Sequence, residues 1–266
     1  MPLFAAALAR KLTRPAANCA RDCRSNRYGG REMKVLGITN PGLIRDNNED
    51  CFFINREKRL LIVADGMGGH AAGEEASKLA VRTVVSNLGD YLNQPEQRIK
   101  AAITAANAAI LAKSAANSDL NGMGTTLTLA AVLPDCLVTG HIGDSKAFLI
   151  DAEGMLPLTS DHSVSGQLLA LGKITRAEAA CHPQRHVLTR ALGIDSCVDI
   201  EIQRGPWSPG QQLLLCSDGL TEVVSFSEIY QAVAGTGSLE EKINSLLSLV
   251  MERGAPDNVT IILAQL

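Results

Sequence analysis

The chain of 266 residues has few aromatic side chains and no excess of positive charge. Aromatic residues make up only 3% of it, so its core must be built mainly from Leu, Ile, Val and Ala. A net charge of -3 lacks the basic surplus with which proteins follow a phosphate backbone, so we expect no nucleic-acid partner. No apolar run approaches the roughly 20 residues that span a bilayer, and we therefore expect no membrane segment.

Cysteines are also few and scattered. The seven of them are odd in number and include no C-x-x-C pair, which argues against both a zinc site of that type and a disulfide scaffold. This pattern favours a reducing, cytoplasmic location. A hydrophobic content of 46% is enough for a sizeable core, and one large domain is our expectation for the folded part.

Residues 1–32 differ in charge from everything after them. They carry seven Lys or Arg against two acidic residues, a net of +5, which leaves residues 33–266 at -8. We expect a basic N-terminal extension that is disordered or an artefact of the assigned start site, because Met33 opens a natural first strand. The preceding "GGRE" can be encoded by a purine-rich ribosome-binding sequence, and mass spectrometry of the native protein would decide the matter.

From Met33 onward, runs of strands alternate with pairs of helices. The pattern predicts strands over 34–40 and 50–65 with a turn at 55–58, helices over 73–92 and 95–116, three short strands over 124–151, a strand over 211–218, helices over 225–235 and 238–254, and a last strand over 257–266. Residues 159–193 read as an inserted flap subdomain with short helical pieces. Hairpin-sized loops between strands indicate an α+β fold with antiparallel sheets covered by helices.

Acidic residues stand at the edges of several of these strands. Two apolar strands end in Asp-Gly, and three further segments place acids beside a strand: Asp65 and Gly66 in "LLIVADG", Asp218 in "QLLLCSDG", Asp144 in "HIGDS", Asp257 in "APDNVT", and Glu49 with Asp50 in "RDNNED". One Asp before Gly is ordinarily a turn. Five such sites converging in a cleft would repel one another unless a divalent cation relieved the charge.

The ligand chemistry indicates which cation this would be. The candidate ligands are hard oxygens without a pair of His or Cys at metal spacing, so Mg²⁺ or Mn²⁺ is favoured over Zn²⁺. Shared carboxylates suggest two ions, which can hold a bridging water, lower its pKa and clamp the oxygens of a displacement at phosphorus. The sequence therefore points to hydrolysis of phosphate esters.

The segments "RDNNED", "ADGMGGH", "GDSKA", "CSDG" and "PDNVT", in this order, resemble the metal-dependent type 2C serine/threonine protein phosphatases (the PPM family), and the bacterial branch in particular. The resemblance covers about 34–266. It implies a four-layer α-β-β-α sandwich, in which helix pairs flank two antiparallel sheets. It also implies a role in signal transduction, with phosphorylated proteins as substrates and a cognate serine/threonine kinase as a partner. We expect a monomer.

The resemblance also assigns metal ligands. Asp65 would bridge both Mn²⁺ or Mg²⁺ ions and the Gly66 carbonyl would bind one of them. The remaining roles are implied as follows: Asp218 and Asp257 complete the first ion's site, Glu49 serves the second directly or through water, Asp50 is its close neighbour, and Asp144 holds a third, weaker ion together with Asp218. Neither Asp161 nor His162, at the start of the flap, is expected to be a ligand.

Three further residues receive roles beside these ligands. Arg45 would grip the substrate phosphate, for which a guanidinium offers a planar fork of donors that Lys lacks. Asn258 is interpreted as an orienting residue rather than a ligand. His70 is open to two interpretations, general acid for the leaving oxygen or structural residue at a helix entrance. The remaining histidines, His141, His182 and His186, are interpreted as structural.

The chain departs from the bacterial pattern at two places, with Lys146 where Arg is commoner and His186 where Asn is commoner. Both could change how the flap recognises substrates. No phosphoenzyme is expected, because no C-x₅-R or D-x-D loop is present, and the glycines near His70 lack the Lys of a phosphate-binding P-loop. Two alternatives stay open: a catalytically lapsed binding module, and a phosphatase dedicated to one regulatory protein or to a small phosphate ester.

Overall fold

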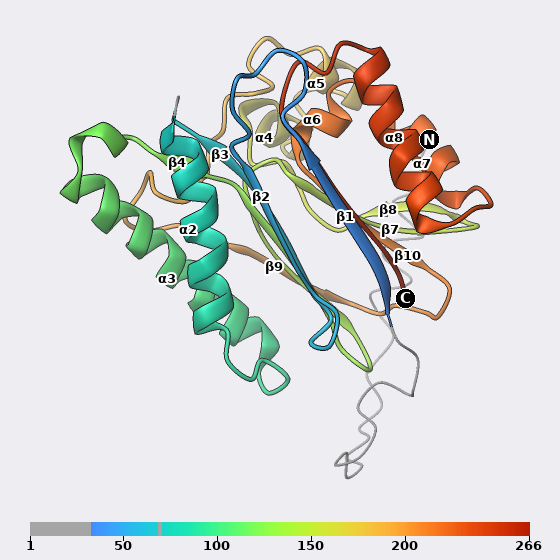
Figure 1. Cartoon of the computed structure of the whole chain (residues 1–266), viewed down its shortest axis with the longest axis horizontal. Coiled ribbons are helices and arrows are strands. Elements are labelled where there is room, and N and C mark those ends of the chain that lie inside the picture. The colour runs from blue at the N-terminus through green and yellow to red at the C-terminus, as the bar shows by residue number, and fades with distance from the viewer. Residues whose placement is uncertain (1–32, 69–70) are drawn as a thin grey trace.

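Two antiparallel β-sheets stack face to face, and helices cover the outer face of each (Figure 1). The structure is a computed structural model that describes residues 33–68 and 71–266. The predicted α+β class and four-layer α-β-β-α arrangement are confirmed. The predicted extension over 1–32 and His70 lie outside the described residues.

The five-stranded sheet has the order β1-β11-β10-β7-β8, with every neighbouring pair antiparallel. Its strands are β1 (Lys34–Asn40), β7 (Lys146–Asp151), β8 (Gly154–Pro157), β10 (Gln212–Cys216) and β11 (Val259–Gln265). The first and last described strands are thus neighbours, which joins the beginning of the domain to its end.

The second sheet has the order β2-β3-β5-β6-β9, and a short strand β4 pairs with β3 beside this path. Its members are β2 (Asp50–Asn55), β3 (Leu60–Met67), β4 (Gly124–Thr125), β5 (Leu127–Val132), β6 (Leu137–Ile142) and β9 (Glu201–Gly205). All of these pairs are antiparallel as well.

The helices form two outer layers and one smaller group. Helices α2 (Ala71–Asn87) and α3 (Pro95–Ala116) cover the six-stranded sheet, and α6 (Asp218–Thr221), α7 (Phe226–Ala234) and α8 (Leu239–Glu252) cover the five-stranded one. The segment predicted as a flap contains α4 (Val164–Ala170) and α5 (Arg176–Ala180). A 3-10 turn, η1, spans Ser118–Leu120.

Apolar side chains fill three layers, and β3 shows how the sequence creates them. Its even-numbered residues Leu60 and Ile62 pack beneath α2 and α3, whereas Leu61 and Val63 pack against the five-stranded sheet. Successive side chains of a strand point to opposite faces, so a strand buried on both faces reads as one continuous apolar run. By the same alternation, Asp65 shares the face of Leu61 and Val63, and its carboxyl points between the sheets.

Some predicted boundaries were wrong. The first helix ends at Asn87 rather than at residue 92, because Gly89 takes a left-handed backbone (φ 59°) that terminates a right-handed helix. The region 124–151 holds four strands instead of three, and β8 and β9 were not predicted. Strand β9 has a mixed, half-exposed composition and is held by its pairing with β6, a contact that no local pattern reports. Among the described helices, none has the length and apolarity needed to cross a bilayer.

Candidate active site

Two of the predicted acids lie directly opposite each other on neighbouring strands. Asp50, the first residue of β2, pairs in register with Asp65 near the end of β3. Both side chains share the face between the sheets, since Phe52 and Ile54 of β2 also pack there. Like charges directly opposite each other destabilise an antiparallel pair, so this position requires a compensating charge or proton.

Asp50 is buried and receives two hydroxyl hydrogen bonds on one oxygen. Ser217 Oγ and Thr260 Oγ1 each donate to Asp50 Oδ2 at 2.7 Å. The other oxygen, Oδ1, is buried and has no hydrogen-bond donor among the described residues. Desolvation, opposed by the two hydroxyls and assisted by the charges of Asp218 and Asp257, raises the pKa of Asp50 to about 7.

Asp65 and Asp218 lie at the centre of this group. Asp218 follows β10 and opens α6, and it shares a hydrogen bond with Asp65. Desolvation is the larger cause and the charges of neighbouring carboxylates the smaller cause of a raised pKa in both groups. The pKa of Asp65 lies well above its usual range. The charges that act on Asp65 include those of Asp50, Asp144 and Asp257, so acids from five segments of the chain meet at one place.

Asp144 enters from the turn between β6 and β7. Gly143, which precedes it, has a φ of 108°, a conformation open to glycine at little cost. The residue is 8% exposed, and burial together with the charge of Asp218 raises the pKa of Asp144 to about 7. Beside it, Lys146 forms an ion pair with Asp161 and donates to the Asp144 carbonyl at 3.2 Å.

Close backbone approach explains the glycines around Asp65. The Gly66 amide donates to the Glu49 carbonyl at 3.1 Å, and a Cβ at Gly66 would overlap the carbonyls of Gly73 and Glu49. A Cβ at Gly73 would overlap the Glu49 carboxylate itself, which therefore lies against the first turn of α2. The end of β3, the segment before β2 and the start of α2 thus meet without space for side chains.

On the other side of the site, the loop over 41–49 is joined to Asp257 and Asn258. Arg45 Nη2 lies 2.7 Å from Asp257 Oδ2, and the guanidinium side chain is 55% exposed, with further donors available to a ligand. Asn258 Oδ1 accepts from the Glu49 amide at 2.8 Å, while its Nδ2 donates to the carbonyls of Pro41 and Asn47, both at 2.9 Å. One amide side chain therefore orients the loop that carries Arg45 and Glu49.

This arrangement fits hard divalent cations. Asp50 Oδ1 and Asp218 Oδ1 are both buried without a donor from the described chain, although buried carboxylate oxygens ordinarily have one. The ligands predicted from the sequence are all oxygens, which Mg²⁺ and Mn²⁺ prefer. Divalent ions would remove the repulsion that otherwise leaves these acids protonated.

A network of hydrogen bonds secures the two histidines beyond Asp144. His141 Nε2 donates to the Ser160 carbonyl at 3.0 Å and Nδ1 lies 2.9 Å from Thr128 Oγ1. His162 Nδ1 accepts from the Gly143 amide at 3.2 Å and Nε2 contacts Glu201 at 3.1 Å. Every ring nitrogen is engaged, which supports a structural interpretation of both residues.

One residue near the site was missed by sequence reasoning. The side chain of Glu222 is 19% exposed, and desolvation together with the charges of Asp218 and Asp257 raises its pKa to about 7. The available signal is its position four residues after Asp218, one helical turn away. The Asp-Gly pair at the start of this segment favours a turn, and that local signal hides the helical spacing.

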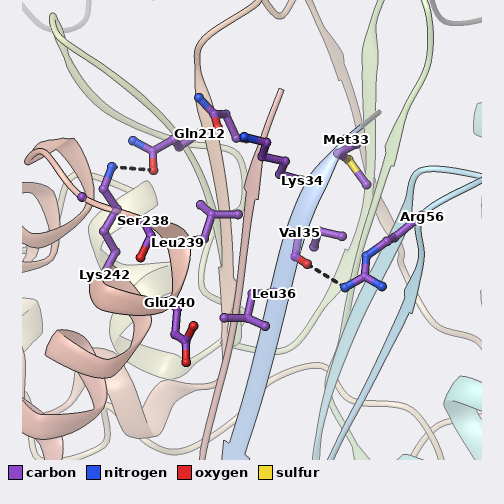
Figure 2. A pocket seen from close by; sticks show the side chains of 12 residues that line it. Met33, Lys34, Val35, Leu36, Arg56, Gln212, Ser238, Leu239, Glu240 and Lys242 are labelled. Carbon is purple, nitrogen blue, oxygen red and sulfur yellow. Dashed lines mark hydrogen bonds between the residues drawn. The ribbon is translucent and has the colours of Figure 1, made fainter. Parts of the chain in front are cut away.

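A separate pocket lies between β1 and the start of α8, at the opposite end of β1 from the acids (Figure 2). None of the predicted site residues lines it. Two of its three cationic side chains already have partners, since Arg56 Nη2 donates to the Val35 carbonyl and Lys242 Nζ to Gln212 Oε1, both at 3.1 Å. The acidic cluster is therefore the better candidate for chemistry.

Two stacked antiparallel sheets with acids gathered at the ends of their strands are the arrangement expected of a metal-dependent phosphatase. A family model described as protein phosphatase 2C matches residues 45–261. The chain belongs to the protein phosphatase 2C family.

Individual relatives agree with this assignment. The serine/threonine phosphatase stp of Listeria innocua is 36% identical over 235 residues, which are 85% of this chain and 93% of that protein. The crystal structure of Stp1 from Staphylococcus aureus superposes with a TM-score of 0.84 at 34% identity, covering 92% of this chain and 99% of that one. The catalytic domain of PstP, crystallised with two manganese ions, gives a TM-score of 0.77 at 36% identity and covers 88% and 98%.

Proposed function

We propose that this chain hydrolyses phosphoserine and phosphothreonine in proteins, using Mn²⁺ or Mg²⁺ at the acidic cluster. The observation that carries the proposal is the convergence of Asp50, Asp65, Asp144, Asp218 and Asp257, two of them with buried oxygens that lack a donor. The named relatives are serine/threonine phosphatases, and one related structure holds two manganese ions. A phosphorylated protein, and upstream of it a kinase, are the partners that this activity requires.

The proposed metal set is carried by the same geometry. Asp65 would serve two ions. The Gly66 carbonyl, Asp218 and Asp257 would complete the site of the first ion, and Glu49 and Asp50 would serve the second. Asp144 together with Asp218 would hold a third, weaker ion. The bound ions would supply a water of lowered pKa and neutralise charge on the phosphate. We expect these sites in a monomeric, cytoplasmic protein that needs no second chain to complete them.

The chain's own residues would position the substrate. Arg45 presents exposed guanidinium donors beside Asp257, where a phosphate can accept two of them. Asn258 holds the loop of Arg45 and Glu49 through three hydrogen bonds. Ser217 and Thr260 keep Asp50 oriented through one oxygen and leave the other for a cation.

Turnover of para-nitrophenyl phosphate with Mn²⁺, with and without a chelator, tests the proposal. We expect activity only with metal, a loss of at least about 100-fold in Asp218→Ala, and wild-type activity in the matched variant Asp135→Ala. Asp135 is an exposed acid at the far end of the sheet, paired with Arg204 at 3.5 Å. Turnover that survives chelation would overturn the metal mechanism.

A phosphothreonine peptide distinguishes the remaining alternatives. Release of phosphate from unrelated phosphopeptides is expected of a protein phosphatase. Activity on the small ester alone would favour an enzyme for small phosphate esters, and activity on one phosphoprotein only would favour a dedicated enzyme. No turnover with any metal would favour a catalytically lapsed binding module.

A further inference from the structure

A second group of potential ligands lies beside Asp218 on the side of the 159–193 segment. His186 Nδ1 is 2.6 Å from Glu222 Oε1. Ligand atoms of His186, Asp218 and Glu222 all lie within 4.8 Å of one another. Donors bound to one ion by bonds of about 2.1 Å are themselves separated by about 3 to 4 Å, so the three ligand atoms lie near the required spacing once the ion pair of His186 and Glu222 widens around a cation.

The backbone fixes the two carboxylates on one face. Asp218 is the first residue of α6 and Glu222 follows four positions later, with its amide donating to the Asp218 carbonyl at 2.8 Å. Residues four apart on a helix lie on the same side, one turn from each other. Asp218 Oδ1 is buried and has no donor from the described residues, which leaves an oxygen for a cation.

Main-chain hydrogen bonds hold the backbone that carries His186 in the other segment, while its side chain is 45% exposed. The Arg185 amide donates to the His182 carbonyl at 3.1 Å and the Val187 amide to the Gln184 carbonyl at 3.2 Å, which closes a turn around His186. Directly after this turn, the Val164 amide donates to the Val187 carbonyl at 2.9 Å and a bridge joins residues 163 and 188. His186 therefore lies beside α6 on a turn that main-chain hydrogen bonds stabilise.

The donor set differs from that of the acidic cluster. An imidazole with two carboxylates suits Zn²⁺ or Mn²⁺, whereas Mg²⁺ prefers oxygen ligands alone. We infer that His186, Glu222 and Asp218 form a further transition-metal site, which ties the 159–193 segment to α6. This inference extends the proposed phosphatase site, with which it shares Asp218, and it changes the interpretation of His186 from structural residue to ligand.

Zn²⁺ is the probe for this site. Crystals of the full chain, soaked in Zn²⁺ and measured at the zinc edge, should show an anomalous peak at bonding distance from the His186 ring. In solution, competition with a chromophoric chelator in excess Mg²⁺ should show one Zn²⁺ fewer, or at least tenfold weaker binding of one Zn²⁺, for His186→Asn than for wild type. Glu222→Gln should weaken the same ion.

His182→Asn is the matched control, because it removes an imidazole from the same turn and keeps an acceptor for the Gln184 amide, which now donates to His182 Nδ1 at 3.1 Å. It should bind Zn²⁺ like wild type. Equal binding by His186→Asn and wild type would overturn the inference and leave an ordinary ion pair. A crystal peak without a difference in solution would mean binding at crystal concentration only, which would overturn the inference as well.

Turnover of para-nitrophenyl phosphate with Mn²⁺, measured on the same wild-type preparation, separates the two proposals. Turnover without Zn²⁺ at His186 overturns only the further site. Zn²⁺ at His186 without turnover under any metal overturns only the phosphatase activity.

Discussion

At the scale of single residues, the site concentrates groups that would be unfavourable elsewhere. Asp50 and Asp65 stand opposite each other between the sheets, and burial raises the pKa of both. Neutral side chains at these positions would stabilise the metal-free sheet, since like charges opposite each other destabilise it. Acids at these positions make sense when a cation occupies the space between them.

Arg45 provides the first prediction. Arg45→Ala should lower kcat/KM for para-nitrophenyl phosphate by about 10- to 100-fold, because charge-assisted hydrogen bonds to phosphate are each stronger than neutral ones. Arg45→Lys should restore only part of this loss, since Lys offers a point charge without the planar fork. Steady-state kinetics with Arg56→Ala, which alters an arginine at the far end of β1, provide the control. Unchanged kinetics in Arg45→Ala would remove Arg45 from the phosphate site.

At the scale of elements, side chains hold loops and strands in position for the acids. Asn258 joins the 41–49 loop to the start of β11, and His141 joins β5 and β6 to the beginning of the 159–193 segment. Both residues work through paired polar groups, so their removal leaves partners unsatisfied.

Asn258→Asp tests the connection between the 41–49 loop and the start of β11. The near-isosteric change replaces two N–H donors by a carboxylate oxygen that faces the carbonyls of Pro41 and Asn47. We expect a loss of about 2 to 3 kcal/mol in the free energy of unfolding and weaker Mn²⁺ binding, measured by urea unfolding and by titration. Asn87→Asp, at the exposed end of α2, should change the free energy of unfolding by less than about 1 kcal/mol.

His141 makes stability depend on pH. Burial lowers the pKa of His141 to about 4, below the ordinary value of about 6.5 in an unfolded chain. The contribution of neutral His141 to the free energy of unfolding is therefore complete above about pH 6.5. About 3 kcal/mol of it is lost as the pH falls toward 4. His141→Gln should remove this part of the acid slope in urea unfolding, whereas the slopes from the carboxylates are common to both proteins and cancel. Parallel acid slopes in the two proteins would contradict the prediction.

At the scale of the whole molecule, three apolar layers hold two sheets rigidly enough to keep five acids together. Strands such as β3 and β11 are covered on both faces, and acids lie at their ends, Asp65 near the end of β3 and Asp257 just before β11. The site thus lies on strand ends supported by the entire core. Its charges should in turn affect global stability.

Metal removal should therefore destabilise the folded chain in a pH-dependent way. In the metal-free protein the pKa values of Asp50 and Asp144 are raised to about 7, so the folded state retains protons that the unfolded state has lost above pH 4. Metal-free stability should fall as the pH rises from 4 to 7. Mn²⁺ at one fixed concentration, about 100-fold above its Kd at pH 8, should raise Tm by about 5 °C or more at pH 8 and by less at pH 5.5. Calorimetry can measure both shifts. An equal rise at both pH values would count against this.

The sequence by itself determined most of the strands, the long helices and the resemblance to the family. Apolar runs that end in acids can be read locally, because alternation and helical spacing are properties of neighbouring residues. The order of the five acidic segments, from "RDNNED" to "PDNVT", was enough to predict the fold class and the five aspartates of the acidic cluster, though not Glu222 beside them.

Only the tertiary structure decided which distant side chains meet. The register of β2 on β3 sets Asp50 opposite Asp65, and the turn before residue 187 brings His186 to Glu222. Strand β9, which has no clear local pattern, exists because β6 pairs with it. Such contacts depend on the packing of whole sheets, and a chain read one segment at a time carries no signal for them.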